Sequence, residues 1–257
     1  MKAVILAGGL GTRISEESHL RPKPMVEIGG QPILWHILKI YSSFGINDFV
    51  ICLGYKGYLV KEYFMNYALH NSNITIDLSK NTVDYHQLNS EPWKITLIET
   101  GINTGTGGRL LKISDHLESH SNFCLTYGDG VGNINITKEI AFHNQNQKIG
   151  TVCAVKPPGR YGLMELDNHK VASFNEKKLE GGEWVNGGFF VFKQEVLNYI
   201  NEESDSLEID VLPRLVNDDQ LSAWKHTGYW QPMDTMRDKK VLEDGWSEVP
   251  PPWKTWQ

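Results

Sequence analysis

The residues best suited to chemistry begin directly after the first apolar run. Residues 2–7 predict a short buried strand. The segment that overlaps its end is rich in glycine and reads Leu6-Ala7-Gly8-Gly9-Leu10-Gly11-Thr12-Arg13. Glycines let backbone amides approach an anion, and Arg13 adds a permanent positive charge next to the Thr12 hydroxyl. The segment predicts a phosphate-binding loop, but a tight strand–helix turn without a ligand would need the same glycines.

A lysine follows this loop between two prolines. Lys23 stands between Pro22 and Pro24, which favours an extended segment that could aim its ammonium at one place. A surface lysine in a turn is the simpler interpretation. Two common phosphate loops do not match: G-x-G-x-x-G has Ile14 where its third glycine should stand, and G-x-x-x-x-G-K-[ST] does not occur. A generic dinucleotide-dependent oxidoreductase is therefore disfavoured.

A second candidate site follows the apolar run at residues 122–127, which predicts a central strand. This run ends at Gly128-Asp129-Gly130. A carboxylate at the end of such a strand can hold Mg²⁺, a hard cation that prefers oxygen ligands and keeps several waters. Asp-Gly is also a common turn pair. The residues alone therefore leave a metal ligand and a simple turn open.

Alternating strands and helices must position these residues. In the first half, short apolar runs alternate with segments of helical spacing, which indicates βαβ units. We expect strands at 2–7, 48–53, 73–78, 94–99 and 122–127, and helices at 31–44, 57–70 and 106–118. This order predicts a Rossmann-like α/β fold of three layers with a mixed, mostly parallel sheet. Both glycine motifs then lie at the carboxyl ends of strands, where ligands bind in such sheets.

The second half has a different pattern. Short strand-like runs follow one another, which is consistent with an antiparallel extension of the sheet. We expect strands at 149–156, 161–166, 170–175 and 184–192, and helices at 193–201, 208–217 and 235–245. Residues 246–257 contain three prolines and three tryptophans. This tail either packs on its own domain or forms a subunit contact.

The composition argues against several classes of function. The 257 residues carry a net charge of −6, so a general nucleic-acid binder, which needs a basic face, is not expected. Cys52, Cys124 and Cys153 each fall in an apolar run, which predicts buried free thiols and a reducing cytoplasm. No run approaches the ~20 apolar residues of a membrane span, and the start lacks the features of a signal peptide, so no membrane association is expected.

The glycine loop and the downstream lysine together carry a resemblance. GGLGTR followed by PKPM resembles the signature of the sugar-nucleotide nucleotidyltransferases, which join a nucleoside triphosphate to a sugar 1-phosphate and release pyrophosphate. The resemblance implies the nucleotide-diphospho-sugar transferase fold, as a single domain over residues 1–257. Residues 1–130 would form mainly the nucleotide-binding half, residues 131–245 mainly the sugar-binding half, and residues 246–257 the tail.

The resemblance also implies roles for individual residues. Asp129 and Asp234 match two family aspartates that bind Mg²⁺, although Asp234 could instead be the N-cap of the helix expected at 235–245. Arg13 and Lys23 would be catalytic, stabilising the α-phosphate and the leaving pyrophosphate. The nucleotide would contact Leu6, Ala7, Gly8, Gly9, Leu10, Gly11, Thr12, Arg13, Lys23, Thr104, Arg109 and Gly128. The sugar phosphate would contact Gly162, Glu176, Lys177 and Asn186. Gly105 and Lys178 depart from the family pattern, which usually has methionine and proline there.

Longer stretches are similar to family members that use CTP and glucose 1-phosphate. They include RISEESHLRPK, VNGGFFVF and YWQPMDTMRDK. The expected reaction transfers a cytidylyl group from CTP to α-D-glucose 1-phosphate, giving CDP-glucose and pyrophosphate by Mg²⁺-assisted in-line attack on the α-phosphorus. Two alternatives stay open: a relative that uses UTP or dTTP, and a non-catalytic nucleotide-sugar-binding subunit. The resemblance further implies a homo-oligomer, with a hexamer as the expected form, and a product that feeds dideoxysugar synthesis for surface polysaccharides such as O-antigen.

Overall fold

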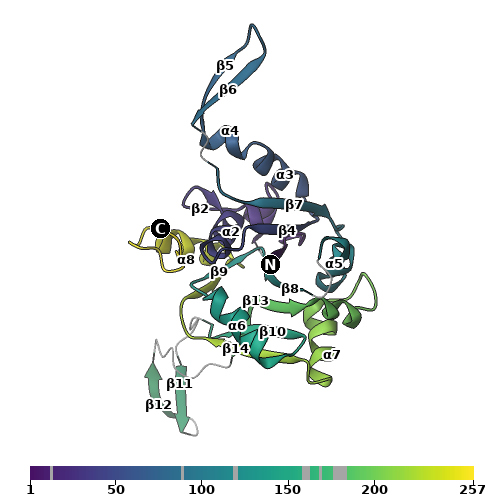
Figure 1. Ribbon diagram of the computed structural model, residues 1–257. Coiled ribbons are helices and arrows are strands. Elements are labelled where there is room, and N and C mark those ends of the chain that lie inside the picture. Colours follow the sequence, from purple (N-terminus) through teal and green to yellow (C-terminus); the bar gives the residue numbers. More distant parts are fainter. Residues whose placement is uncertain (12–13, 88–89, 118–120, 158–162, 168–169, 176–183) are drawn as a thin grey trace.

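The computed structural model arranges the chain in three layers, with a seven-stranded sheet between two groups of helices (Figure 1). It describes all residues except 12–13, 88–89, 118–120, 158–162, 168–169 and 176–183. In spatial order the sheet consists of β14 (Leu221–His226), β10 (Gly150–Val155), β13 (Val185–Lys193), β8 (Asn122–Tyr127), β1 (Lys2–Leu6), β4 (Asp48–Leu53) and β7 (Lys94–Glu99).

The sheet is mixed and mostly parallel, which confirms the predicted fold class. β13 runs antiparallel to both of its neighbours, β10 and β8. The pairs β10–β14, β8–β1, β1–β4 and β4–β7 are parallel. β10 and β14 therefore run in the same direction as β8, so the second half of the chain continues the parallel sheet around one reversed strand.

Alternating side chains on the central strands separate two apolar clusters. Ala3 and Ile5 belong to one cluster, and Val4 and Leu6 belong to the other, as the period of two along a strand requires. The first cluster includes residues of α2 (Ile33–Ser43), α3 (Gly57–Met65), α6 (Ile136–Asn146) and α8 (Met236–Trp246). The second includes residues of α5 (Thr106–Lys112), η5 (Leu207–Val211) and α7 (Leu212–Asn217). Helices thus cover both faces, as predicted.

Short elements complete the fold. The remaining ones are α1 (Ser15–Ser18), η2 (Lys23–Met25), β2 (Glu27–Ile28), β3 (Gln31–Pro32), α4 (Tyr67–Asn71), β5 (Asn73–Asp77), β6 (Thr82–Gln87), η3 (Ser114–His116), β9 (Gly130–Gly132), β11 (Leu163–Asp167), β12 (Lys170–Asn175), η4 (Gln194–Tyr199) and β15 (Trp230–Pro232). β11 and β12 correspond to two strands of the expected extension, and they form an antiparallel hairpin outside the main sheet.

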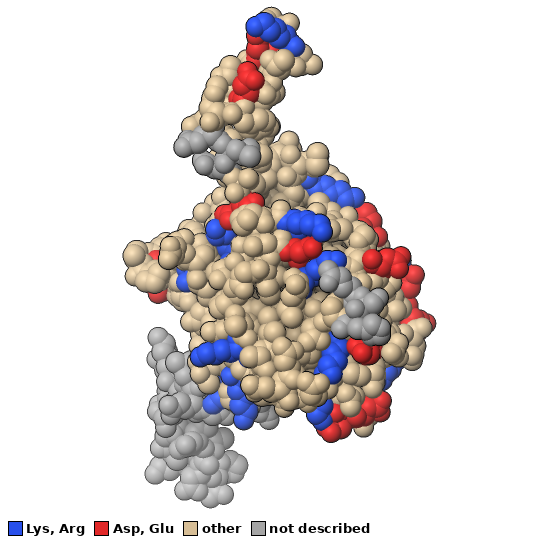
Figure 2. All heavy atoms as spheres, in the orientation of Figure 1, with Lys and Arg blue, Asp and Glu red and all other residues tan. Residues whose placement is uncertain are grey.

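The strand expected at 73–78 forms but does not join the sheet. It is β5, which pairs antiparallel with β6 in a hairpin that projects from the body (Figures 1 and 2). Four apolar side chains on the hairpin are exposed: Ile76, Leu78, Val83 and Tyr85. Over the face in Figure 2, basic and acidic side chains lie interspersed.

Other elements also differ from expectation. The helix expected at 57–70 is interrupted at Asn66, whose side-chain amide donates to the carbonyl of Glu62 (2.9 Å) where α3 ends. The helix expected at 193–201 is the shorter 3₁₀ segment η4. Helix α6 and strand β14 were not predicted.

The tail packs on its own chain. Trp253 is fully buried, and its indole N–H lies 3.4 Å from Nδ1 of His36 on α2. The rings of Trp246 and Trp256 also contact His36. Of the two alternatives for the tail, the structure therefore favours packing on its own domain.

The cysteines agree with expectation, since all three are free and buried, in β4, β8 and β10. Within the part of the chain that the structure describes, no helix is both long and apolar enough to cross a membrane.

Candidate active site

Both glycine-rich motifs lie at the same edge of the sheet. β1 and β8 are parallel neighbours, and Leu6 pairs in register with Tyr127. The amide of Gly128 donates a hydrogen bond to the carbonyl of Leu6 (3.0 Å), so the two loops leave the sheet side by side. The loop after β1 and Asp129 after β8 therefore border one pocket, as the predicted strand ends require.

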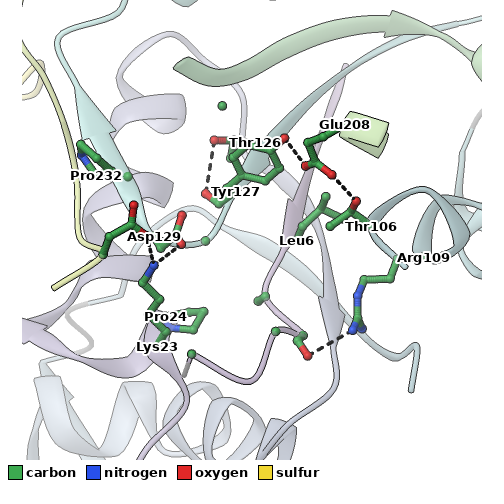
Figure 3. Close-up of a pocket in the computed structure, with 18 of the residues that line it drawn as sticks. Leu6, Lys23, Pro24, Thr106, Arg109, Thr126, Tyr127, Asp129, Glu208 and Pro232 are labelled. Atoms are coloured by element: carbon green, nitrogen blue, oxygen red, sulfur yellow. Dashed lines mark hydrogen bonds and ion pairs between the residues drawn. The ribbon is translucent and has the colours of Figure 1, made fainter. Parts of the chain in front are cut away.

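This pocket has a volume of about 780 Å³, which suits a nucleotide-sized ligand (Figure 3). Its walls come from both halves of the chain. Among the residues predicted to bind nucleotide, those that line it are Leu6, Ala7, Gly8, Gly9, Leu10, Gly11, Lys23, Thr104, Arg109 and Gly128. Both predicted metal ligands, Asp129 and Asp234, line the same pocket, and so does Asn186 from the predicted sugar site.

Several predicted site residues lie outside the described residues. They are Thr12, Arg13, Gly162, Glu176 and Lys177, together with the departure at Lys178. Their roles stay predictions.

Arg109 supports the glycine loop from behind. It is buried, and its guanidinium donates to the carbonyls of Gly8 and Leu53 (both 3.1 Å) and to Oγ1 of Thr100 (2.5 Å). A β-carbon at position 8 would lie 2.0 Å from Nη1 of Arg109, so a side chain there would displace the guanidinium from the loop. Burial lowers the pKa of Arg109 from its ordinary value, but a guanidinium remains charged. A positive charge therefore lies beneath the loop that was predicted to hold phosphates.

Gly105, where the resemblance led us to expect a departure from the family pattern, packs closely against another segment of the chain. A β-carbon there would lie 2.2 Å from the carbonyl oxygen of Asp205, so the turn before η5 fills the space of a side chain. The amides of Gly105 and Gly107 donate to the carbonyls of Glu203 and Asp205 (both 2.9 Å). These amides at the start of α5 are thus hydrogen-bonded within the chain.

Lys23 begins the short 3₁₀ segment η2 and is 8% exposed. Pro22 is extended (φ −67°, ψ 149°), but the amide of Met25 donates to the carbonyl of Pro22 (2.8 Å), so the chain turns at once. The extended segment expected around Lys23 therefore ends at Pro22. The turn directs the lysine side chain into the pocket (Figure 3).

The Lys23 ammonium lies between two carboxylates. Its Nζ is 2.5 Å from Oδ2 of Asp129 and 2.8 Å from Oδ1 of Asp234 (Figure 3). Burial opposes the charge, but the attraction and hydrogen bonds of both aspartates outweigh it, so the pKa of Lys23 is raised above its ordinary value. The structure thus brings together three predicted site residues that the sequence separates widely.

A short pair of strands places Asp234 close to Asp129. β9 and β15 pair antiparallel, with Gly130 opposite Pro232. Directly after this pair, the amide of Met233 donates to the carbonyl of Asp129 (2.8 Å). The two aspartates therefore lie close together because Met233, the residue before Asp234, is hydrogen-bonded to the backbone of Asp129.

The alternative role of Asp234 as a helix N-cap is wrong. The N-cap of α8 is Thr235, whose Oγ1 accepts from the amide of Asp238, while the Asp238 carboxylate accepts from the amide of Thr235 (2.9 Å). This reciprocal arrangement is a capping box, which satisfies the helix start without Asp234. The Asp234 carboxylate is thereby left to face Lys23.

The two carboxylates fit a divalent cation. One nitrogen atom already lies within hydrogen-bonding distance of both, so a single cation can contact both. The described residues contain no group of three or more His, Cys, Asp or Glu side chains suited to a metal. Mg²⁺ suits a site with two carboxylates, because it keeps several waters and takes the substrate phosphates as further ligands.

Sequence reasoning missed a second polar group in the pocket. The Tyr127 hydroxyl donates to Oε1 of Glu208, and Oγ1 of Thr106 donates to Oε2 of the same carboxylate (2.7 Å; Figure 3). The amide of Asn186 donates to the Tyr127 oxygen (3.2 Å). Tyr127 could have been found, because it ends a predicted strand next to Asp129. Glu208 carries no local signal in the sequence.

Comparisons with known proteins agree with this geometry. A sequence model of the family described as nucleotidyl transferase matches residues 2–238. The chain is 49% identical over 257 residues to a glucose-1-phosphate cytidylyltransferase of Salmonella typhi, and the match covers all of both chains. It is 39% identical over 259 residues to a probable glucose-1-phosphate cytidylyltransferase of Bacillus subtilis, again over both full lengths. The solved structure of HddC from Yersinia pseudotuberculosis matches with a TM-score of 0.68 at 23% identity, covering 96% of this chain and 99% of that one, which shows the fold.

Proposed function

This chain belongs to the nucleotidyl transferase family, and we infer that it transfers a cytidylyl group from CTP to α-D-glucose 1-phosphate, giving CDP-glucose and pyrophosphate. The observation that carries this conclusion is the similarity to two glucose-1-phosphate cytidylyltransferases, which are 49% and 39% identical to this chain over its full length. The pocket agrees with it, since a glycine loop, a buried lysine and two carboxylates converge there.

The reaction requires two polyanions to meet. A phosphate oxygen of glucose 1-phosphate attacks the α-phosphorus of CTP, a new P–O bond forms, and the bond to the leaving pyrophosphate breaks. Neutralising charge and holding the groups in line should supply most of the catalysis. We propose that the amides and side chains of residues 6–13 hold the triphosphate, with Arg109 beneath them, and that Thr104 and Gly128 border the nucleotide.

We propose that Asp129 and Asp234 hold Mg²⁺. Bound there, the ion would neutralise phosphate charge and polarise the α-phosphate. Lys23 contacts both carboxylates, so an ion held there would compete with its ammonium, which would then be available to the α-phosphate. Arg13 would meet the leaving pyrophosphate, and Gly162, Glu176, Lys177 and Asn186 the sugar phosphate.

A pyrophosphate-release assay tests the reaction. CTP, UTP, dTTP and GTP are each offered with glucose 1-phosphate and with mannose 1-phosphate. We expect CTP with glucose 1-phosphate to give the highest kcat/KM. Equal or better turnover with UTP or dTTP would support the alternative base. Nucleotide binding without pyrophosphate release would support a non-catalytic subunit.

We also propose a homo-oligomer, with a hexamer as the expected form. The support is the projecting β5–β6 hairpin, which exposes Ile76 and Leu78 (54% and 89%). Light scattering after size exclusion should give an oligomer for the wild type and a smaller species for Leu78→Asp. A wild-type monomer would contradict the proposal. We propose that the enzyme works in the cytoplasm, because its three thiols are free. We also propose that its product feeds dideoxysugar synthesis for surface polysaccharides.

A further inference from the structure

A hydrogen-bonded chain of side chains lines another part of the pocket than the carboxylates of Asp129 and Asp234. It runs from the amide of Asn186 on β13 to the hydroxyl of Tyr127 at the end of β8. From there it continues to Glu208 of η5 (Figure 3). Oε2 of Glu208 accepts from Thr106 and from Ser206 (both 2.7 Å). Three hydroxyl groups therefore donate to one carboxylate, and the Asn186 amide joins the network through Tyr127.

The direction of these hydrogen bonds follows from the chemistry of the groups. An ionised carboxylate only accepts, so the Tyr127 proton points to Glu208, and the Asn186 amide donates to the Tyr127 oxygen. Burial of Glu208 opposes its ionisation, but the hydrogen bonds from Tyr127, Ser206 and Thr106 outweigh it and lower the pKa of Glu208. What Tyr127 and Glu208 still offer to a ligand is therefore lone pairs.

The free lone pairs on the Tyr127 and Glu208 oxygens favour a ligand that can donate a hydrogen bond. A phosphate brings negatively charged oxygens, which the Glu208 carboxylate repels, whereas a sugar hydroxyl can donate its proton. Asn186, on the same chain of hydrogen bonds, is where the sugar is proposed to lie, and the inference rests on that placement. We propose that the Tyr127 oxygen accepts a hydrogen bond from a glucose hydroxyl, and that Glu208 is a positioning residue that keeps the Tyr127 proton turned away from the sugar.

The substitution Glu208→Gln tests the proposal with little change in shape. Its amide nitrogen can donate to the Tyr127 oxygen, which would turn the phenol proton towards the sugar. We expect the KM for glucose 1-phosphate to rise about tenfold, while the KM for CTP changes by less than about twofold. Tyr127→Phe should have a similar effect. In the double variant, Glu208→Gln should add nothing to Tyr127→Phe, because Glu208 acts through that hydroxyl.

The matched control is a second tyrosine–carboxylate pair outside the pocket. The Tyr199 hydroxyl donates to Asp218 (3.0 Å), and Tyr199→Phe should leave both KM values unchanged. The inference is overturned if Glu208→Gln raises the KM for CTP as much as that for glucose 1-phosphate, or if its effect persists in the Tyr127→Phe background. Either result shows that Glu208 only supports the backbone. A wild-type chain without cytidylyl transfer overturns the proposed function and this inference together.

Discussion

The Nζ atom of Lys23 lies 2.5 Å from Oδ2 of Asp129, at a site where Asp234 also contacts it. The ammonium thus takes the position between two carboxylates that suits a divalent cation. Under the proposal that Asp129 and Asp234 hold Mg²⁺, the ion and the lysine would compete for these carboxylates, and metal binding would make the ammonium available to the substrate.

Removing the lysine should separate metal binding from catalysis. We expect Lys23→Met to lower kcat by about 10²–10³-fold, because a preorganised charge at the α-phosphate is lost. The same variant should bind Mn²⁺ about tenfold more tightly without nucleotide, since a competing ion pair worth ~1–2 kcal/mol is gone. Electron paramagnetic resonance of free Mn²⁺ measures this directly.

The control is Lys94→Met, which removes an exposed lysine that pairs with Asp48 (3.2 Å) on the surface. It should change neither kcat nor Mn²⁺ affinity. Weaker Mn²⁺ binding by Lys23→Met than by the wild type would show that the two cations do not share a site.

Asp234→Asn should raise the Mg²⁺ concentration needed for half-maximal activity by at least about tenfold, because the carboxylate proposed to bind the ion is replaced by a neutral amide. Asp244→Asn, on the exposed face of α8 next to Lys240, is the matched control and should not shift that concentration. A metal titration of initial rates gives the comparison. An unchanged Mg²⁺ requirement in Asp234→Asn would remove Asp234 from the metal site.

Glu139 should make stability depend on pH. It is 1% exposed, its Oε1 has no hydrogen-bond partner among the described residues, and burial raises its pKa from 4.5 to about 8. Between these two values the folded state keeps a proton that the unfolded state releases. Stability should therefore fall as the pH rises through this window, by up to about 1.4 kcal/mol per pH unit.

Urea unfolding of the wild type and Glu139→Gln from pH 5 to 9 measures this effect. Relative to the wild type, the free energy of unfolding of Glu139→Gln should increase as the pH rises to about 8, and the difference between the two proteins should stay constant above that pH. His36 and His143, whose pKa values burial lowers to about 4, are present in both proteins. A difference that does not vary with pH would mean that Glu139 is charged in the folded state.

Trp253→Ala should destabilise the fold by about 3–5 kcal/mol, because it removes a fully buried ring from the cluster under α2 and α8. Tyr58, which is 56% exposed, is the control, and its alanine variant should stay within about 0.5 kcal/mol of the wild type. Denaturant unfolding measures both. A small loss in Trp253→Ala would indicate that the tail contributes little to the domain.

β4, β7 and β8 have the bounds expected from the sequence alone. β4 and β8 could be predicted because they are largely apolar and buried on both faces. β7 is a half-buried edge strand, and its apolar residues Ile95, Leu97 and Ile98 still marked it. α6 could not be found this way, because its sequence ITKEIAFHNQN is mostly polar and shows little apolar periodicity. β14 was missed for a similar reason, since LSAWKH mixes polar and apolar residues at one edge of the sheet.

Site residues could be predicted where a local sequence pattern identifies them, but not where contacts between distant segments create the site. The loop at residues 6–13 is recognisable by its glycines, Lys23 by its flanking prolines and Asp129 by its flanking glycines. Asp234 came from family resemblance, because the link to Asp129 is a strand pair of only three residues on each side. Glu208 reaches Tyr127 across 81 positions and looks like any helical glutamate.

The most direct test of the central claim is a ³¹P NMR time course of the wild-type protein with CTP, glucose 1-phosphate and Mg²⁺. We expect the resonances of CTP and glucose 1-phosphate to decline together, while those of CDP-glucose and pyrophosphate grow in equal amounts. Unchanged substrates, or CTP that decays to phosphate without consuming glucose 1-phosphate, would contradict cytidylyl transfer by this pocket.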